Sequence, residues 1–130
     1  MPDSNAAKLA GDMLKEKMAE MDSVGGIIEC VVAGMPTGVG EPVFDKLDAN
    51  LAKAIMSIGA VKGIEIGDGF AVATSTGSKD NDGFKVENGH ISKTSNHAGG
   101  VLGGISDGSP IVLRAAIKPT PSIAMTQQTV

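Results

Sequence analysis

The sequence predicts an α+β fold in which a mostly antiparallel sheet has helices packed on one face. Two stretches carry apolar residues at helical spacings of three and four, and several others are runs of β-branched residues typical of strands. Their order is helix, strand, helix, strand and then hairpin-like strands, which favours this layered arrangement. With 130 residues, the chain is expected to form a single domain over residues 1–130.

The first helix is predicted to begin at Asp3 or Ser4, because either side chain can accept a hydrogen bond as an N-cap. Methionine side chains adapt to irregular space, so the methionines of this helix are expected to fill the core. The apolar positions recur at helical spacing as Ala6, Leu9, Ala10, Met13, Leu14, Met18 and Met21.

A strand is predicted at residues 27–33, after Gly25 and Gly26 interrupt the helical pattern. Cys30 in this strand is expected to be a buried small apolar residue, since no neighbouring motif indicates a reactive thiol. Glu29 then points to the opposite face of the strand.

A second helix is predicted from Pro42, because proline suits the first helical turn. Strands are predicted at 61–66 and 111–117, and residues 70–76 are expected to be a short helix or irregular. The apolar face of the second helix consists of Phe44, Leu47, Leu51, Ile55 and Ile58.

Residues 74–92 are predicted to form a flexible loop and hairpin insertion. The stretch 77–83 is polar and rich in turn-forming residues. The dipeptide Asn88-Gly89 between two apolar segments predicts a tight hairpin turn.

The composition limits the classes of partner. The net charge is −4, with 15 acidic and 11 basic side chains, so no basic stripe for nucleic acid is expected. No apolar stretch is long enough to span a membrane, and no signal peptide pattern is present. Cys30 is the one cysteine, which fits a reducing compartment, and the cytoplasm is the expected location.

The usual ligand motifs are incomplete. Gly38-Val39-Gly40 lies between a strand and a helix, but Val43 occupies the place of the third glycine of a dinucleotide fingerprint, so a simple turn is favoured. His90 and His97 have no partners at metal-ligand spacing, and no zinc site is expected.

One glycine-rich stretch and the segment after the final strand favour an anion site. Two glycine pairs between residues 95 and 108 let another group approach the backbone closely. Lys118 supplies charge at a strand end, and the N–H groups of Thr120 and Ser122 supply directed donors. A glycine-rich hairpin with a surface lysine is the alternative interpretation.

These segments resemble chorismate synthase, in register over residues 3–130. The resemblance implies an α+β domain that forms half of a β-α-β sandwich, assembled into homotetramers, with an apolar flank where the other half belongs. The matching blocks are Asp22-Ser23-Val24-Gly25-Gly26, residues 38–48 (GVGEPVFDKLD), residues 60–70 (AVKGIEIGDGF), Asn81-Asp82, Ser95-Asn96 with Ala98-Gly99-Gly100, and residues 118–123 (KPTPSI).

The resemblance also implies a reaction and a cofactor. Members of this family convert 5-enolpyruvylshikimate 3-phosphate into chorismate and phosphate with reduced FMN, in the shikimate pathway. The positions that match the family's flavin contacts are Gly59, Ala60, Asn96, Gly103, Lys118, Pro119, Thr120, Pro121 and Ser122. His97 is at a position where the family varies and is given no catalytic role.

The family's catalytic segments do not match any part of this sequence. A Gly-Glu-Ser-His-Gly motif, a second histidine and an arginine-rich block are absent, so no catalytic residue is assigned and the chain alone is expected to be inactive. Two other functions stay open at this point, namely a non-catalytic interaction or scaffold module, and a dinucleotide-binding module that uses residues 38–42.

Overall fold

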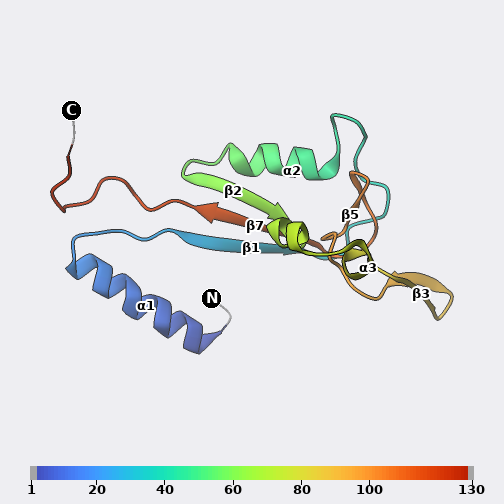
Figure 1. Cartoon of the computed structure of the whole chain (residues 1–130), viewed down its shortest axis with the longest axis horizontal. Coiled ribbons are helices and arrows are strands. Elements are labelled where there is room, and N and C mark those ends of the chain that lie inside the picture. The colour runs from blue at the N-terminus through green and yellow to red at the C-terminus, as the bar shows by residue number, and fades with distance from the viewer. Residues whose placement is uncertain (1–2, 129–130) are drawn as a thin grey trace.

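The centre of the fold is a three-stranded antiparallel sheet, in which β7 (Ile111–Ile117) lies between β1 (Gly26–Val32) and β2 (Val61–Ile66) (Figure 1). The computed structural model describes residues 3–128. The α+β class and the antiparallel pairing are confirmed, and β2 and β7 have the predicted bounds. β1 begins and ends one residue earlier than predicted.

The core lies on one face of this sheet. Along β7, Ile111, Leu113 and Ala115 are 1%, 4% and 6% exposed, while the residues between them are less buried. This alternation follows from the two-residue period of a strand. Val61 of β2 and Val101, from the segment before β7, are also buried.

The second helix, α2 (Leu47–Met56), packs beside β2. Its predicted start at Pro42 is wrong, because the chain before Leu47 is held in other contacts. The N–H of Glu41 donates to the Asp45 carbonyl at 2.9 Å, and the N–H of Leu47 donates to the Gly104 carbonyl at 2.8 Å. Phe44 is therefore outside the helix and 90% exposed.

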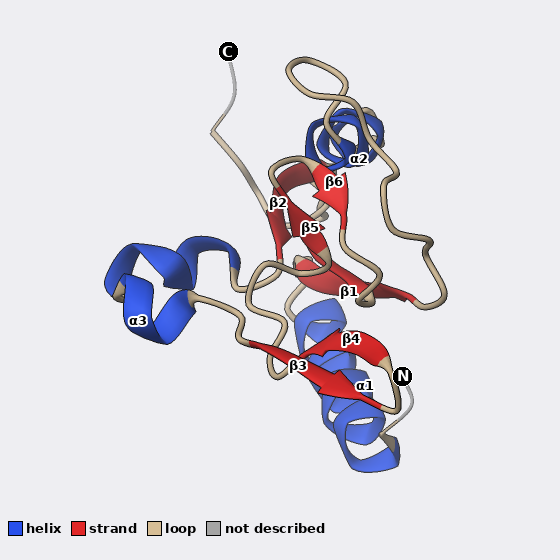
Figure 2. Ribbon diagram, turned by 90° about the vertical axis from the view of Figure 1, so that its right-hand side faces the viewer, coloured by secondary structure: helices blue, strands red, loops and turns tan. Residues whose placement is uncertain are grey.

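The first helix, α1 (Ser4–Ala19), begins as predicted but packs differently. The Asp3 carboxylate caps it by accepting from the N–H of Ala6 at 2.7 Å. None of its residues is buried, and Met18 is 74% exposed. The prediction that its methionines fill the core is wrong for this chain, since α1 lies beyond the β1 edge of the sheet while α2 lies at the β2 edge (Figures 1 and 2).

β1 is an edge strand whose two faces are both open. Ile27 and Ile28 point to opposite faces and are 71% and 61% exposed. Cys30 is also exposed, so the prediction that it is buried is wrong. α1 and β1 therefore expose large apolar side chains, and the apolar flank that the resemblance implies stays a prediction.

Short elements connect β2 to β7. Asn88 and Gly89 have φ angles of 52° and 76°, which confirms the predicted tight turn of the β3–β4 hairpin. The flexibility expected for residues 74–92 stays a prediction. The elements are the 3-10 helix η1 (Gly69–Thr74), α3 (Gly77–Asp80), β3 (Phe84–Glu87), β4 (His90–Lys93), β5 (Val101–Leu102) and β6 (Ile105–Ser106).

Candidate functional site

Two of the segments singled out from the sequence meet at the end of the sheet where β2 begins and β7 ends. The N–H of Lys118 donates to the Ala60 carbonyl at 2.9 Å, and the strands pair from Val61 and Ile117 onward. Ala60 has a φ of 71°, a conformation that side chains other than glycine adopt rarely. The structure therefore brings Gly59 and Ala60 next to the segment that starts at Lys118.

A third segment supports this strand end from the other side. The Ser23 hydroxyl donates to the Thr120 carbonyl at 2.7 Å. A Cβ at Gly25 would lie 2.5 Å from the Ile117 carbonyl oxygen and 3.1 Å from Cδ of Pro119, so this position has room only for glycine. Residues 22–26, which belong to the matching sequence blocks, thus hold the chain after β7 in place.

The segment after β7 carries hydrogen-bond donors that have no acceptor among residues 3–128. The Lys118 side chain is exposed and makes no ion pair or hydrogen bond within residues 3–128. In the same part of the chain, the N–H groups of Thr120 and Ser122 donate to no protein acceptor. An ammonium group and two free N–H groups on one proline-stiffened segment are the donor set that an anionic group requires.

Asn96 and Gly103 lie at the other end of β7. The Asn96 carbonyl oxygen Oδ1 accepts from the N–H of Gly100 at 2.8 Å, and its Nδ2 donates to the Pro110 carbonyl at 2.8 Å. The Asn96 side chain therefore holds the glycine turn before β5. Gly103 has a φ of 60° in the β5–β6 turn, and a Cβ there would meet nothing within 4 Å, so the space above its backbone is open.

The predicted flavin-contacting residues therefore form two groups. Gly59 and Ala60 lie with residues 118–122, whereas Asn96 and Gly103 are near the start of β7. Seven residues of strand separate the two groups, which corresponds to roughly 20 Å. In Figure 1, β7 ends at the left of the sheet, and the segment labelled β5 lies beyond the right end.

A buried ionic cluster lies near the second group and was not predicted from the sequence. Nζ of Lys93 is 2.8 Å from Asp82 Oδ2 and 2.6 Å from Asp107 Oδ2. The side chains of Lys93, Asp82 and Asp107 are 4%, 2% and 9% exposed. Burial disfavours the charged carboxylates, but hydrogen bonds from Lys93 and neighbouring donors outweigh it and lower the pKa of both Asp82 and Asp107.

Lys93 belongs to the β3–β4 hairpin. Among the described residues, it is the only charged side chain of this hairpin that is deeply buried. For Lys93, too, burial opposes the charge, and the hydrogen bonds to Asp107 and Asp82 raise the pKa of the ammonium above its ordinary value. No local signal distinguishes Lys93 from Lys85, since both are on short hairpin strands. Lys85 pairs with Glu87 on the surface instead.

His97 also has a partner. Its Nδ1 lies 2.7 Å from Asp68 Oδ2, with both side chains partly exposed. The hydrogen bond to Asp68 is the main cause that raises the pKa of His97, against a smaller opposing effect of burial. This pair joins the loop after β2 to the turn that contains Asn96.

Three of the four backbone N–H groups of the glycine loop at residues 38–42 are engaged within the protein, and among the described residues only that of Gly40 has no acceptor. The N–H of Gly38 donates to the Ser106 carbonyl at 2.9 Å, and the N–H of Val39 donates to the Ser106 hydroxyl at 2.8 Å. A Cβ at Gly40 would collide with the Gly104 carbonyl oxygen. These glycines permit close packing of the loop against the β5–β6 hairpin, which supports the simple-turn interpretation.

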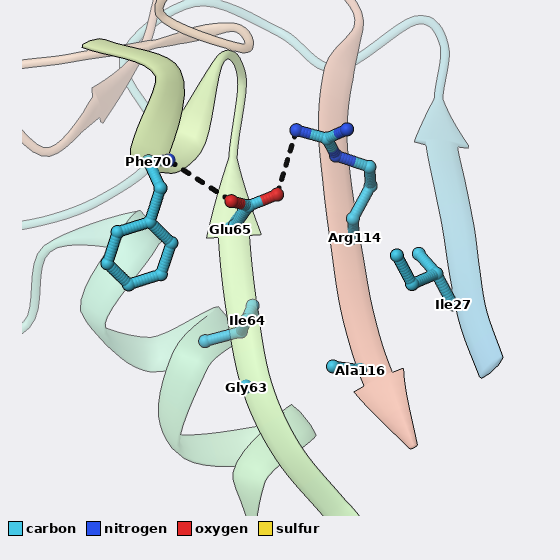
Figure 3. A pocket seen from close by; sticks show the side chains of 7 residues that line it. All are labelled: Ile27, Gly63, Ile64, Glu65, Phe70, Arg114 and Ala116. Atoms are coloured by element: carbon cyan, nitrogen blue, oxygen red, sulfur yellow. Dashed lines mark hydrogen bonds and ion pairs between the residues drawn. The ribbon is translucent and has the colours of Figure 1, made fainter. Parts of the chain in front are cut away.

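A hollow of about 210 Å³ lies on the face of the sheet opposite the core (Figure 3). Gly63 and Ala116 form part of its floor, and Glu65 is shared between Arg114 Nη2 at 2.8 Å and the N–H of Phe70 at 3.1 Å. Because the charged groups of Arg114 and Glu65 are paired with each other, the hollow offers apolar walls but no free cation. The Lys118 segment is therefore the better candidate for binding an anion.

Comparisons with known proteins agree with the sequence blocks. A sequence model of the family described as chorismate synthase matches residues 1–130. The chain is 62% identical over 130 residues to a chorismate synthase of Agathobacter rectalis, covering 100% of this chain and 35% of that relative. It is 58% identical over 125 residues to a chorismate synthase of Methanosarcina barkeri, covering 93% and 34%.

A solved structure agrees as well. It is described as a crystal structure of chorismate synthase and superimposes with a TM-score of 0.86 at 35% identity, covering 92% of this chain and 37% of that one. The chain thus spans about a third of the length of the relatives that it matches. Within residues 3–128, no helix is long and apolar enough to cross a membrane, and no three His, Cys, Asp or Glu side chains are grouped to hold a metal ion.

Proposed function

Because the chain belongs to the chorismate synthase family, we propose that it is a cofactor-holding part of an enzyme that uses reduced FMN. The complete enzyme converts 5-enolpyruvylshikimate 3-phosphate into chorismate and phosphate by anti-1,4-elimination, a carbon–oxygen lyase reaction of the shikimate pathway. Reduced FMN supplies the electron density that helps the phosphate leave. Since the chain spans about a third of its relatives, the chain alone is inactive in this proposal.

The observation that carries this proposal is the meeting of Gly59 and Ala60 with the Lys118 segment. The two stretches are far apart in the sequence, yet they are joined by the hydrogen bond from Lys118 to the Ala60 carbonyl. Within residues 3–128, the result is a backbone corner with an ammonium group that has no partner and with two free N–H groups, at Thr120 and Ser122. This donor set fits the phosphate of FMN.

Each part of the chain has a distinct task in this proposal. Lys118 supplies positive charge to the anionic end of the cofactor, and the backbone from Pro119 to Ser122 supplies directed donors. The open backbone of Gly103 lets a flat ring approach closely. Because the length of β7, roughly 20 Å, separates Gly103 from Lys118 and is more than one FMN can span, Gly103 contacts a flavin that is held by the Lys118 segment of another copy in the proposed homotetramer. Asn96 acts indirectly, because both ends of its amide are engaged in holding the turn that leads to Gly103.

The test is a fluorescence titration of FMN into the chain and into Lys118→Ala. We expect saturable binding by the unsubstituted chain and about tenfold weaker binding by the variant, because one charge-assisted contact is lost. Lys85→Ala is the matched control, since Lys85 is an exposed lysine whose ion pair with Glu87 lies on the β3–β4 hairpin. Equal affinities for Lys118→Ala and the unsubstituted chain would contradict the role of Lys118.

A scaffold or interaction module is the second candidate, and the exposed apolar surface of α1 and β1 favours it. Met18, Ile27 and Ile28 are each more than half exposed, and large apolar side chains exposed on two consecutive elements are suited to an interface. Within the proposed enzyme the same surface contacts the remainder of the protein in a homotetramer located in the cytoplasm. A clean monomer at high concentration in light scattering would contradict self-association through this surface.

A further inference from the structure

The buried cluster of Lys93, Asp82 and Asp107 joins three segments that are separate in the sequence. Asp82 follows α3, Lys93 ends β4, and Asp107 follows β6. Charges are rarely placed in the interior unless they are paired and hydrogen-bonded, because removal from water is costly. The location of such a cluster therefore indicates which segments the fold must hold together.

Asp82 holds the chain where it enters the β5–β6 hairpin. Its Oδ1 accepts from the Ser95 hydroxyl and from the N–H of His97, both at 2.7 Å, and its Oδ2 accepts from the N–H of Ala98 at 3.1 Å. These donors surround Asn96, whose side chain fixes the following turn through Gly100. One carboxylate thus organises the whole turn before β5.

Asp107 holds the chain where it leaves the same hairpin. Its Oδ1 accepts from the N–H of Ser109 at 2.8 Å, and its own N–H donates to the Gly100 carbonyl at 3.0 Å. The entry and the exit of the hairpin are therefore adjacent. Lys93 bridges them, because its ammonium contacts Asp82 and Asp107 at once.

We propose that Lys93 is a positioning residue that closes the base of the β5–β6 hairpin and thereby sets the place of Gly103 at its tip. This inference rests on the proposed function, in which the open backbone of Gly103 contacts the flavin. Without the ammonium, two carboxylates that are each at least nine-tenths buried face each other, and their repulsion separates the entry of the hairpin from its exit. Lys93 itself contacts no cofactor in this scheme.

The first experiment measures amide hydrogen exchange in the complete 130-residue chain and in Lys93→Met, which keeps the length of the side chain but not its charge. We expect exchange across residues 95–108 to accelerate more in the variant than exchange in β1 and β7, where any increase reports the general loss of stability. Lys85→Met is the matched control on the same hairpin, and we expect no change in its exchange. Unchanged exchange across residues 95–108 in Lys93→Met would overturn the proposal.

A second, milder variant covers the case in which Lys93→Met does not fold. Asp107→Asn keeps the size of the side chain and an acceptor for Ser109, but weakens the ion pair with Lys93. The same local increase in exchange is expected, with smaller amplitude. An increase spread evenly over the sheet would instead show a global loss of stability and would overturn a positioning role.

The second experiment is an FMN titration, well below the unfolding temperature of every variant. We expect about tenfold weaker binding for Lys93→Met, as is typical when a residue behind a binding group is removed. The combination with Lys118→Ala should multiply the two effects, because the two lysines act at opposite ends of β7. A local increase in exchange together with unchanged FMN affinity would overturn the link between Lys93 and the flavin.

The outcomes separate the inference from the proposed function. Failure of the unsubstituted chain to bind FMN would overturn the proposal that this chain holds the cofactor by itself. The exchange experiment would still decide whether Lys93 closes the base of the hairpin, since that measurement requires no flavin.

Discussion

Lys93 and Lys118 are at the two ends of the same sheet, and their surroundings differ in every respect. Lys93 is 4% exposed and contacts two carboxylates, whereas Lys118 is exposed and has no ionic partner in the described chain. A buried, paired lysine holds segments together, while an unpaired lysine beside free N–H groups is available to an outside anion. The comparison separates the part of the chain that maintains geometry from the part that binds.

The largest expected effect concerns stability. Lys93→Ala should lower the free energy of unfolding by about 3 kcal/mol or more, because it leaves two buried carboxylates without their cation. Lys118→Ala should change it by less than about 0.5 kcal/mol, as is usual for an exposed side chain without partners. Urea unfolding of both variants measures the difference. Equal losses of unfolding free energy in the two variants would contradict a structural role for Lys93 and a binding role for Lys118.

Acid should weaken the Lys93 end of the sheet. Asp82 and Asp107 have pKa values below the ordinary value of 3.8, so near and below pH 4 the unfolded chain binds more protons than the folded one. Their contribution to stability is therefore present above about pH 4 and is lost as the pH falls through their folded pKa values. Urea midpoints should be level between about pH 5 and 6, below the ordinary pKa of 6.5 for His97, and should decline below about pH 4.

This prediction is tested with Asp82→Asn, and an exposed carboxylate of α1, Asp12, provides the control. Asp82→Asn should flatten the decline at acid pH, although it lowers stability at neutral pH. Asp12→Asn, which removes an exposed carboxylate of α1, should retain the decline. A variant of Asp82 with an unchanged acid profile would show that this carboxylate is not the group responsible.

A smaller effect than that of Lys93→Ala is expected from the backbone that supports the Lys118 end. Gly25→Ala should lower stability by about 1–3 kcal/mol and weaken FMN binding, because its Cβ would press on the Ile117 carbonyl and on Pro119. Gly26→Ala is the matched control, since a Cβ there meets nothing within 4 Å. Thermal midpoints and FMN titrations of the pair measure both effects. Equal behaviour of the two variants would contradict the support that we assign to Gly25.

Local sequence patterns predicted the elements that depend on local chemistry. The bounds of β2 and β7, the Asp3 cap and the Asn88-Gly89 turn are confirmed, because each depends on the preferences of a few neighbouring residues. Pro42 was misleading, since the helix begins at Leu47, where the Gly104 carbonyl takes its first N–H. That contact joins residues far apart in the sequence and leaves no local trace.

Burial was predicted less well, for the same reason. Cys30 and the methionines of α1 have the composition of core residues, but whether they are covered depends on which elements pack over them. In the candidate site, some features could be predicted from the sequence and others could not. The donors of the Lys118 segment were predicted from residue types, while its contact with Ala60 and the burial of Lys93 required the three-dimensional arrangement.

The position of β7 in the sheet has a consequence for the order of folding. Among the described residues, both outer strands pair only with β7, which follows them both in the sequence. During synthesis, β1 and β2 therefore leave the ribosome long before their hydrogen-bond partner exists, with apolar side chains and strand edges uncovered. Segments in this state pair readily with the wrong chain. The late arrival of one strand makes the nascent protein dependent on rapid completion or on a chaperone.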